Sequence, residues 1–225
     1  MTRLRPATHV LFDMDGVLLD TERIYTEATQ RIVGRWGKVF DWSVKADMIG
    51  RPALDSARYL VETLELPIAP EDYLREREQL FETLMPMAEA REGARELVEA
   101  LAAAAVPQAV ATSSARRLFE LKTTRHRDWF AHFALVVCGD DPRCRRGKPA
   151  PDIFLLAAAE LGVEPAQCVV VEDAPSGVAA ARAAGMQVVA APDPAMDVSR
   201  YTDADLVVDS LARLTPAVLT GRAAA

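Results

Sequence analysis

The feature that most constrains the fold is a regular alternation of short apolar runs and alanine-rich stretches from about residue 89 onward. The runs, such as LVVC and CVVVED, have the length and β-branched content of buried strands. Because parallel strands need crossover helices, this alternation predicts a parallel sheet with helices on both faces. Expected strands cover 9–12, 109–112, 135–138, 168–173, 187–191 and 205–209; expected helices cover 93–105, 152–161 and 176–184.

The segment that follows the first strand has a different, helical pattern. A helix is expected from Thr21 or Glu22 to about Gly34, followed by two amphipathic helices over 52–66 and 70–85. Both of the later helices have a proline near their start, where proline is well tolerated. We therefore expect an α/β core of residues 1–20 and 89–225, interrupted by a helical domain of residues 21–88.

Composition limits the possible partners. The chain has 225 residues and a formal net charge of −7, which argues against a protein that coats nucleic acid. No apolar stretch approaches the roughly 20 residues of a membrane span, and no apolar signal-peptide run follows the N-terminus. Three cysteines without CxxC spacing indicate a reducing compartment. We expect a monomeric cytoplasmic protein that acts on a small molecule, without nucleic-acid or membrane partners.

Polar residues follow the expected strands at the points where the strands end. Because a ligand site of an open α/β sheet lies outside the carboxyl ends of its strands, these residues are expected to meet at one edge. In chain order they are Asp13 and Asp15, then Thr112, Ser113 and Ser114, then Lys148, and finally Glu172 and Asp173.

This set of side chains suits phosphoryl transfer through an aspartate. Crowded carboxylates need a cation, and oxygen ligands favour Mg²⁺ when a phosphate completes the shell. One carboxylate can attack phosphorus and form an aspartyl phosphate, while a second protonates the leaving oxygen and then activates water. A lysine and a hydroxyl can hold the phosphate oxygens.

The same residues resemble the four motifs of the haloacid dehalogenase-like phosphatases. The DxD pair Asp13/Asp15 is similar to motif I, Thr112 to motif II, Lys148 to motif III and the pair Glu172-Asp173 to motif IV. The resemblance implies a Rossmann-like core with an inserted helical-bundle cap domain, and an Mg²⁺-dependent phosphatase acting on a small phosphorylated metabolite.

The resemblance also implies a role for each residue. Asp13 would be the nucleophile and Asp15 the general acid/base. The metal ligands would be Asp13, Asp173 and the backbone carbonyl of Asp15, with Glu172 acting through water. The phosphate would be held by Thr112, Lys148 and the backbone N–H groups of Met14 and Ser113. Arg51, in the stretch IGRP, is the candidate cap residue for substrate contact.

Longer stretches, among them FDMDGVLLDTERIY, TTRHRDWFAHF and GKPAPDIF, resemble the pseudouridine-5′-phosphatase subgroup of this family. The implied substrate is a nucleoside-like 5′-phosphate such as pseudouridine 5′-phosphate, and a sugar phosphate is the alternative. The related β-phosphoglucomutases have a histidine where this chain has Tyr25, which disfavours a mutase. A non-catalytic binding or regulatory protein with the same fold is the alternative of another class.

Overall fold

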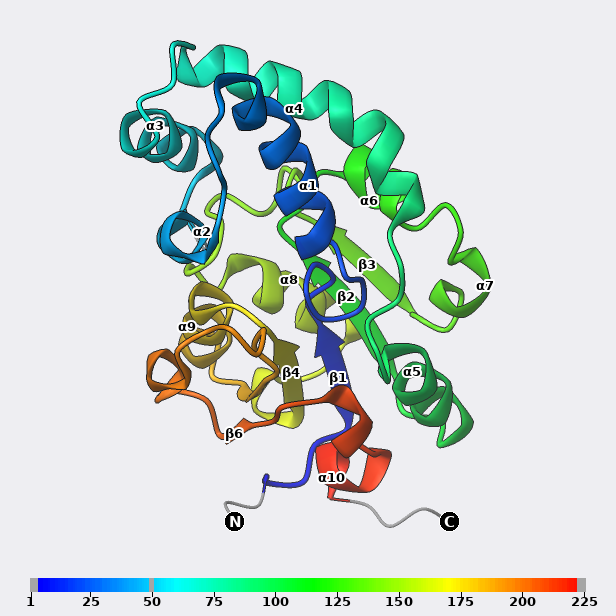
Figure 1. Cartoon of the computed structure of the whole chain (residues 1–225). Coiled ribbons are helices and arrows are strands. Elements are labelled where there is room, and N and C mark those ends of the chain that lie inside the picture. Colours follow the sequence, from blue (N-terminus) through cyan, green and yellow to red (C-terminus); the bar gives the residue numbers. More distant parts are fainter. Residues whose placement is uncertain (1–3, 49–50, 222–225) are drawn as a thin grey trace.

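The computed structural model describes residues 4–48 and 51–221 and contains one six-stranded, fully parallel sheet. The strand order is β3-β2-β1-β4-β5-β6 (Figure 1). The strands are β1 (His9–Phe12), β2 (Gln108–Thr112), β3 (Leu135–Cys138), β4 (Cys168–Glu172), β5 (Gln187–Ala190) and β6 (Leu206–Val207). The predicted parallel α/β fold is confirmed, and each expected strand is present with shifts of two residues or fewer at its ends.

The order of the strands places a topological switch point beside β1. From β1 the chain moves to β2 and β3 on one side, and it then returns to place β4 on the other side. Phe12 is accordingly in register with both Val110 and Val171. A crevice at the carboxyl end of β1, between loops that diverge, is the usual ligand position in such a sheet.

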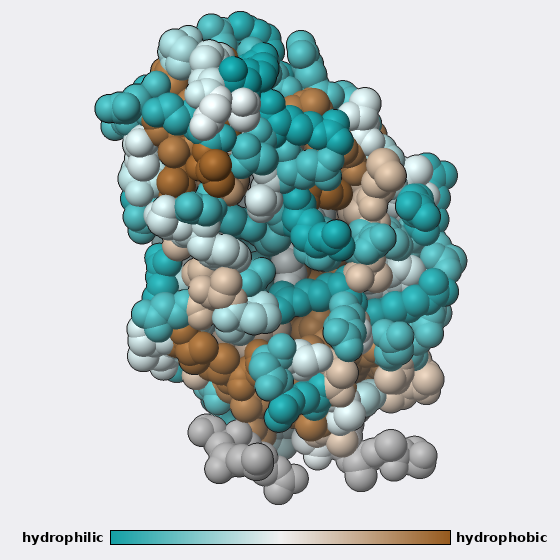
Figure 2. All heavy atoms as spheres, in the orientation of Figure 1, coloured by the Kyte–Doolittle hydropathy of each residue, from teal (hydrophilic) through white to brown (hydrophobic). Residues whose placement is uncertain are grey.

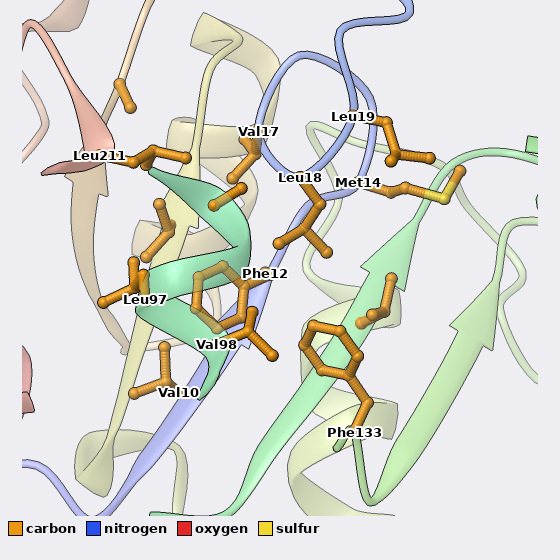
Figure 3. Packing of buried hydrophobic residues seen from close by; sticks show 14 of the residues in the cluster. Val10, Phe12, Met14, Val17, Leu18, Leu19, Leu97, Val98, Phe133 and Leu211 are labelled. Atoms are coloured by element: carbon orange, nitrogen blue, oxygen red, sulfur yellow. The ribbon is translucent and has the colours of Figure 1, made fainter. Parts of the chain in front are cut away.

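Helices cover both faces of the sheet and bury two apolar clusters. Val10 and Phe12 point to one face, where they meet Leu97 and Val98 of the helix α5 (Figure 3). Leu11 points to the opposite face, since side chains alternate along a strand. The helices after residue 88 are α5 (Ala94–Ala103), α6 (Arg116–Lys122), α7 (Arg127–Phe130), α8 (Asp152–Leu161), α9 (Pro175–Ala183) and α10 (Pro216–Thr220).

Four further helices follow β1 and lie beyond the carboxyl ends of the strands (Figure 1). They share their own apolar cluster, in which Ile32, Phe40, Leu60 and Tyr73 are buried. The helices are α1 (Glu22–Val33), α2 (Trp42–Met48), α3 (Ala53–Thr63) and α4 (Pro70–Leu84). Three were expected from the sequence. The short helix α2 was not, because its seven residues hold too little periodicity to reveal an apolar face.

Short 3₁₀ helices complete the described chain: η1 (Gly34–Trp36), η2 (Met85–Met87), η3 (Pro165–Gln167), η4 (Val198–Tyr201) and η5 (Leu211–Arg213). Polar residues cover most of the face seen in Figure 2, and apolar residues show there as separate patches. Within residues 4–48 and 51–221, each helix is too short or too polar to cross a bilayer.

Candidate active site

The loop that follows β1 presents Asp13 and Asp15 at the edge of the sheet. Between them the Met14 side chain is fully buried and joins the apolar core beside Leu18 and Leu19 (Figure 3). The Met14 carbonyl accepts hydrogen bonds from the N–H groups of Leu18 and Leu19, at 2.9 and 3.0 Å. The chain therefore turns tightly after β1, and alternation of side-chain direction keeps both carboxylates out of the core.

Lys148, in the loop before α8, joins two of the acidic residues. Its Nζ atom lies 2.5 Å from Asp13 Oδ1 and 2.6 Å from Glu172 Oε1, and it also donates to the Ala111 carbonyl at 3.1 Å. Burial alone would lower the pKa of this lysine, but the two carboxylates outweigh burial and raise it. Lys148 is therefore charged, and in this structure it donates to Asp13, Glu172 and the Ala111 carbonyl.

Asp13, Glu172 and Asp173 form an acidic cluster around this lysine. One carboxylate oxygen of each residue lies within 4.8 Å of the other two. Burial raises the pKa of Asp13 to about 7, with Glu172 and Asp15 adding to the increase and Lys148 opposing it. Burial raises the pKa of Asp173 as well, and Glu172, Asp13 and Glu22 add to the increase. The cluster thus holds more negative charge than Lys148 offsets, and its oxygen donors fit a hard divalent cation.

Two glycines leave the space that these carboxylates occupy. A Cβ atom on Gly177, in α9, would lie 1.8 Å from Glu172 Oε1. A Cβ atom on Gly16 would lie 2.1 Å from Asp173 Oδ2, and Gly16 also has a φ of +76°. The second carboxylate oxygen of Glu172 accepts the N–H groups of Asp173 and Ala174, at 3.1 and 3.2 Å. Backbone contacts at the end of β4 therefore set the shape of the cluster.

The carboxylate of Asp15 is held by a separate set of donors. Its Oδ1 atom accepts from Thr21 Oγ1 at 2.7 Å and from Lys122 Nζ at 2.6 Å, and its Oδ2 atom accepts from Ser114 Oγ at 2.8 Å. Burial would raise the pKa of Asp15, but the Lys122 charge and these hydrogen bonds lower it. Asp15 is consequently ionised, in contrast to the raised pKa of Asp13 two residues earlier.

Sequence reasoning missed Lys122, and it placed Ser114 at this sheet edge without assigning it a role. Lys122 is the last residue of α6 and its side chain is fully buried. It lies four residues after Leu118 and three after Phe119, both of which pack against the core. A lysine in line with an apolar stripe of a helix needs a buried acid as partner, and that spacing was the available signal.

Thr112 and Ser113 lie where the sequence predicted, at the carboxyl end of β2. Thr112 is fully buried, and its hydroxyl accepts the N–H of Ser114 at 3.0 Å while keeping its own hydrogen for another acceptor. Ser113 is exposed, and its backbone lies against Gly139, where a Cβ atom would approach the Ser113 carbonyl oxygen to 2.3 Å. The loop after β2 therefore lies against the loop after β3, and its Ser114 reaches Asp15 in the loop after β1.

A cavity of about 510 Å³ lies between this edge and the helices that follow β1. Its lining from the sheet side includes Asp15, Ser113 and Ser114, and its lining from the helices includes Tyr25. Arg51 is exposed and also lines this cavity, with its guanidinium 4.6 Å from the centre of the Tyr59 ring. The remaining lining residues are Glu22, Thr29, Phe40, Lys45, Met48, Ala53, Ser56, Arg77, Glu78, Phe81, Ala115 and Leu118.

Comparison with known proteins gives the family. The model of the haloacid dehalogenase-like hydrolases matches residues 7–185. The chain is 46% identical over 214 residues to (DL)-glycerol-3-phosphatase 2 of Arabidopsis thaliana, covering 93% of this chain and 89% of the relative. It is also 46% identical over 216 residues to a probable pseudouridine-5′-phosphatase of Drosophila melanogaster, covering 95% and 94%.

A solved structure, a putative β-phosphoglucomutase from Thermotoga maritima, superposes with a TM-score of 0.72 at 31% identity, covering 91% of this chain and 94% of the other. The prediction of a phosphatase of this family, with relatives in the pseudouridine-5′-phosphatase and β-phosphoglucomutase subgroups, is therefore confirmed. The non-catalytic alternative finds no support among these relatives. On the match over residues 7–185 and the identity with two phosphatases over nearly the whole chain, the protein belongs to the haloacid dehalogenase-like hydrolases.

Proposed function

We propose that this protein hydrolyses the phosphate monoester of a small metabolite through an aspartyl phosphate on Asp13, with Mg²⁺ as its cofactor. The observation that carries the proposal is the cluster of Asp13, Glu172 and Asp173 around a single lysine. A second carboxylate, Asp15, lies beside it and lines a cavity. Asp13 and Asp173 would bind the ion directly, the Asp15 carbonyl would add a ligand, and Glu172 would act through water.

The ion would offset the charge of the carboxylates and of the phosphate. An oxygen of Asp13 attacks phosphorus as the bond from phosphorus to the leaving oxygen breaks, and Asp15 donates a proton to that oxygen. Asp15 then takes a proton from the water that attacks the aspartyl phosphate, which releases inorganic phosphate and restores Asp13. The ionised Asp15 of the present structure is the form needed in the second step; an incoming phosphate, as a like charge, would raise its proton affinity for the first.

The phosphate oxygens would be held by Lys148, by the Thr112 hydroxyl and by the backbone N–H groups of Met14 and Ser113. Lys148 already lies between Asp13 and Glu172. Its ammonium group would therefore need only a small displacement to bind an oxygen of the phosphoryl group that Asp13 attacks. Fixed donors of this kind stabilise the charge that spreads over the phosphoryl oxygens in the transition state.

We further propose that residues 21–88 form a cap domain that excludes water and selects the leaving group. The cavity of about 510 Å³ lies within the usual range of small-molecule sites, roughly 300–1,000 Å³. It can hold a nucleoside-sized group, and pseudouridine 5′-phosphate is the proposed substrate. Arg51 would contact its hydroxylated or anionic part.

Glycerol 3-phosphate is a second candidate substrate, because a relative with equal identity is named as a glycerol-3-phosphatase. A sugar phosphate is a third, and mutase activity is disfavoured by the tyrosine at position 25. The deciding measurement is kcat/KM for pseudouridine 5′-phosphate, uridine 5′-phosphate, glycerol 3-phosphate and a hexose phosphate, each with Mg²⁺ and with a chelator.

A preference for pseudouridine 5′-phosphate would support the nucleoside assignment, and a preference for glycerol 3-phosphate would replace it. Absence of metal-dependent phosphate release from any of these esters, and from p-nitrophenyl phosphate, would overturn the phosphatase proposal. The monomeric state and the cytoplasmic location stay predictions, which gel filtration and imaging of a tagged protein would test.

A further inference from the structure

Lys122 is a buried cation that the proposed chemistry does not yet use. Its Nζ atom contacts three oxygens: Asp15 Oδ1 at 2.6 Å, Ser114 Oγ at 2.8 Å and the Tyr25 hydroxyl at 3.1 Å. Its side chain is 0% exposed, and Asp15 is its ion-pair partner within the described chain. An ammonium group is costly to bury unless its charge is paired and its three N–H groups are bonded, and both conditions are met here.

The three partners of Lys122 come from three different elements. Asp15 follows β1, Ser114 follows β2, and Tyr25 belongs to α1 of the helical insert. The Tyr25 ring is itself held edge-on against Phe81 of α4, with 5.0 Å between the ring centres. Asp15, Ser114 and Tyr25 all line the large cavity. Lys122 therefore links the two sides of the cavity. One side is formed by the loops after β1 and β2, and the other is formed by the helices of residues 21–88.

The same contacts determine how the Asp15 carboxylate can be oriented. Lys122 and Thr21 both donate to Oδ1, and Ser114, itself bonded to Lys122, donates to Oδ2. Rotation of the carboxylate about its bond to Cβ would break these hydrogen bonds together. Such a network holds a side chain more firmly than one contact does, because its members support one another.

We propose that Lys122 is a positioning residue that aims the Asp15 carboxylate at the leaving oxygen of the substrate. The proposal rests on the proposed phosphatase function and adds a residue to it. Lys122 does not contact the substrate; it acts through Asp15. Proton transfer depends on the orientation of the Asp15 carboxylate, since a misplacement of about 1 Å at a reacting centre can cost about 100-fold in rate.

The test compares two leaving groups in the variant Lys122→Met, which keeps a long side chain and removes the charge. An alkoxide leaving group, from glycerol 3-phosphate, needs a proton as it departs, whereas p-nitrophenolate departs without one. We expect kcat/KM for the alkyl ester to fall about 100-fold and kcat/KM for the aryl ester to change little. The readout is the ratio of kcat/KM for the alkyl ester to kcat/KM for the aryl ester, because kcat/KM reports the step that forms the phosphoenzyme.

A matched control is available on the next residue. Thr123 is buried, and its hydroxyl bonds the Phe119 carbonyl of its own helix at 2.8 Å. Thr123→Ala should alter the stability of this helix end and leave the alkyl-to-aryl ratio at the wild-type value. If Lys122→Met does not fold, Tyr25→Phe is used in its place. The Tyr25→Phe substitution removes one hydrogen-bond partner of Lys122 and keeps the aromatic ring, and the alkyl-to-aryl ratio of kcat/KM should then fall several-fold.

Two results would overturn the role of Lys122. One is an unchanged ratio in a folded Lys122→Met protein, or in Tyr25→Phe when the first variant does not fold. The other is an equal loss of kcat/KM on both esters, which is the signature of general structural damage. Failure of the proposed function looks different, since wild-type protein would then release no phosphate from either ester in the presence of Mg²⁺.

Discussion

Replacement of Gly16 by alanine should weaken metal binding more than it weakens the fold. The new Cβ atom would lie 2.1 Å from Asp173 Oδ2 and 2.7 Å from Cγ, so the carboxylate oxygen would have to withdraw by about 1.3 Å to reach ordinary contact at 3.4 Å. Magnesium binds oxygen at about 2.0–2.1 Å in a strict octahedral arrangement, and a displacement of that size removes the ligand. We expect the Mg²⁺ concentration for half-maximal activity to rise about 10–100-fold, as for other disturbances around a metal site.

The same substitution also strains the backbone. Gly16 has a φ of +76°, and a side chain in the left-handed region costs about 1–2 kcal/mol. For a domain of this size that cost lowers Tm by about 2–4 °C per kcal/mol. Thermal unfolding without metal measures the loss of fold stability in Gly16→Ala. Titration of phosphatase activity with Mg²⁺ measures the loss of metal affinity.

Gly185→Ala separates the two effects. Gly185 has a φ of +77°, and a Cβ atom there would meet no atom within 4 Å. Its alanine variant should therefore lose as much Tm as Gly16→Ala and keep the wild-type Mg²⁺ requirement. If Gly16→Ala also kept that requirement, Asp173 would not be a ligand of the catalytic ion and the reasoning would be refuted.

Three other substitutions test the remaining assignments. Asp13→Asn should abolish turnover and the burst of p-nitrophenolate while the circular dichroism spectrum stays native; a normal burst would exclude Asp13 as nucleophile. Lys148→Met leaves Asp13 and Glu172 buried without their cation, so urea unfolding of the metal-free protein should show a loss of about 3–5 kcal/mol. Arg51→Ala should raise KM for the phosphorylated metabolite with little change for p-nitrophenyl phosphate; equal effects on both would contradict a contact with the leaving group.

The strands were predictable because each is a short run of mostly apolar, often β-branched residues, and most of these runs end in polar ones. Cys168–Glu172 and Gln187–Ala190 are buried along their whole length, so both of their faces had to be apolar. At the edge of the sheet, β6 is shorter than expected, at Leu206–Val207, since it pairs only with β5. Its second residue, Val207, is exposed, so burial did not constrain the strand there.

Two short helices after β2 escaped prediction. The helix Arg116–Lys122 has seven residues and Arg127–Phe130 has four, lengths at which the 3.6-residue period completes two turns or fewer. The first of them ends on Lys122. Since the helix itself was not recognised, the spacing of Lys122 from Leu118 and Phe119 was not interpreted as an apolar stripe that includes a buried lysine.

The sequence alone determined the parallel α/β core and the order of the four motifs, and from these motifs it predicted the residues that would carry phosphoryl transfer. These features depend on local patterns: apolar runs, their polar ends, and the spacing of Asp13 from Asp15. Only the tertiary structure decided which charges meet. Lys148 joins Asp13 to Glu172, and Lys122 holds Asp15, across more than 100 residues of chain in two of these three pairs. Such contacts follow from strand order and crossover geometry, which no local pattern of residues records.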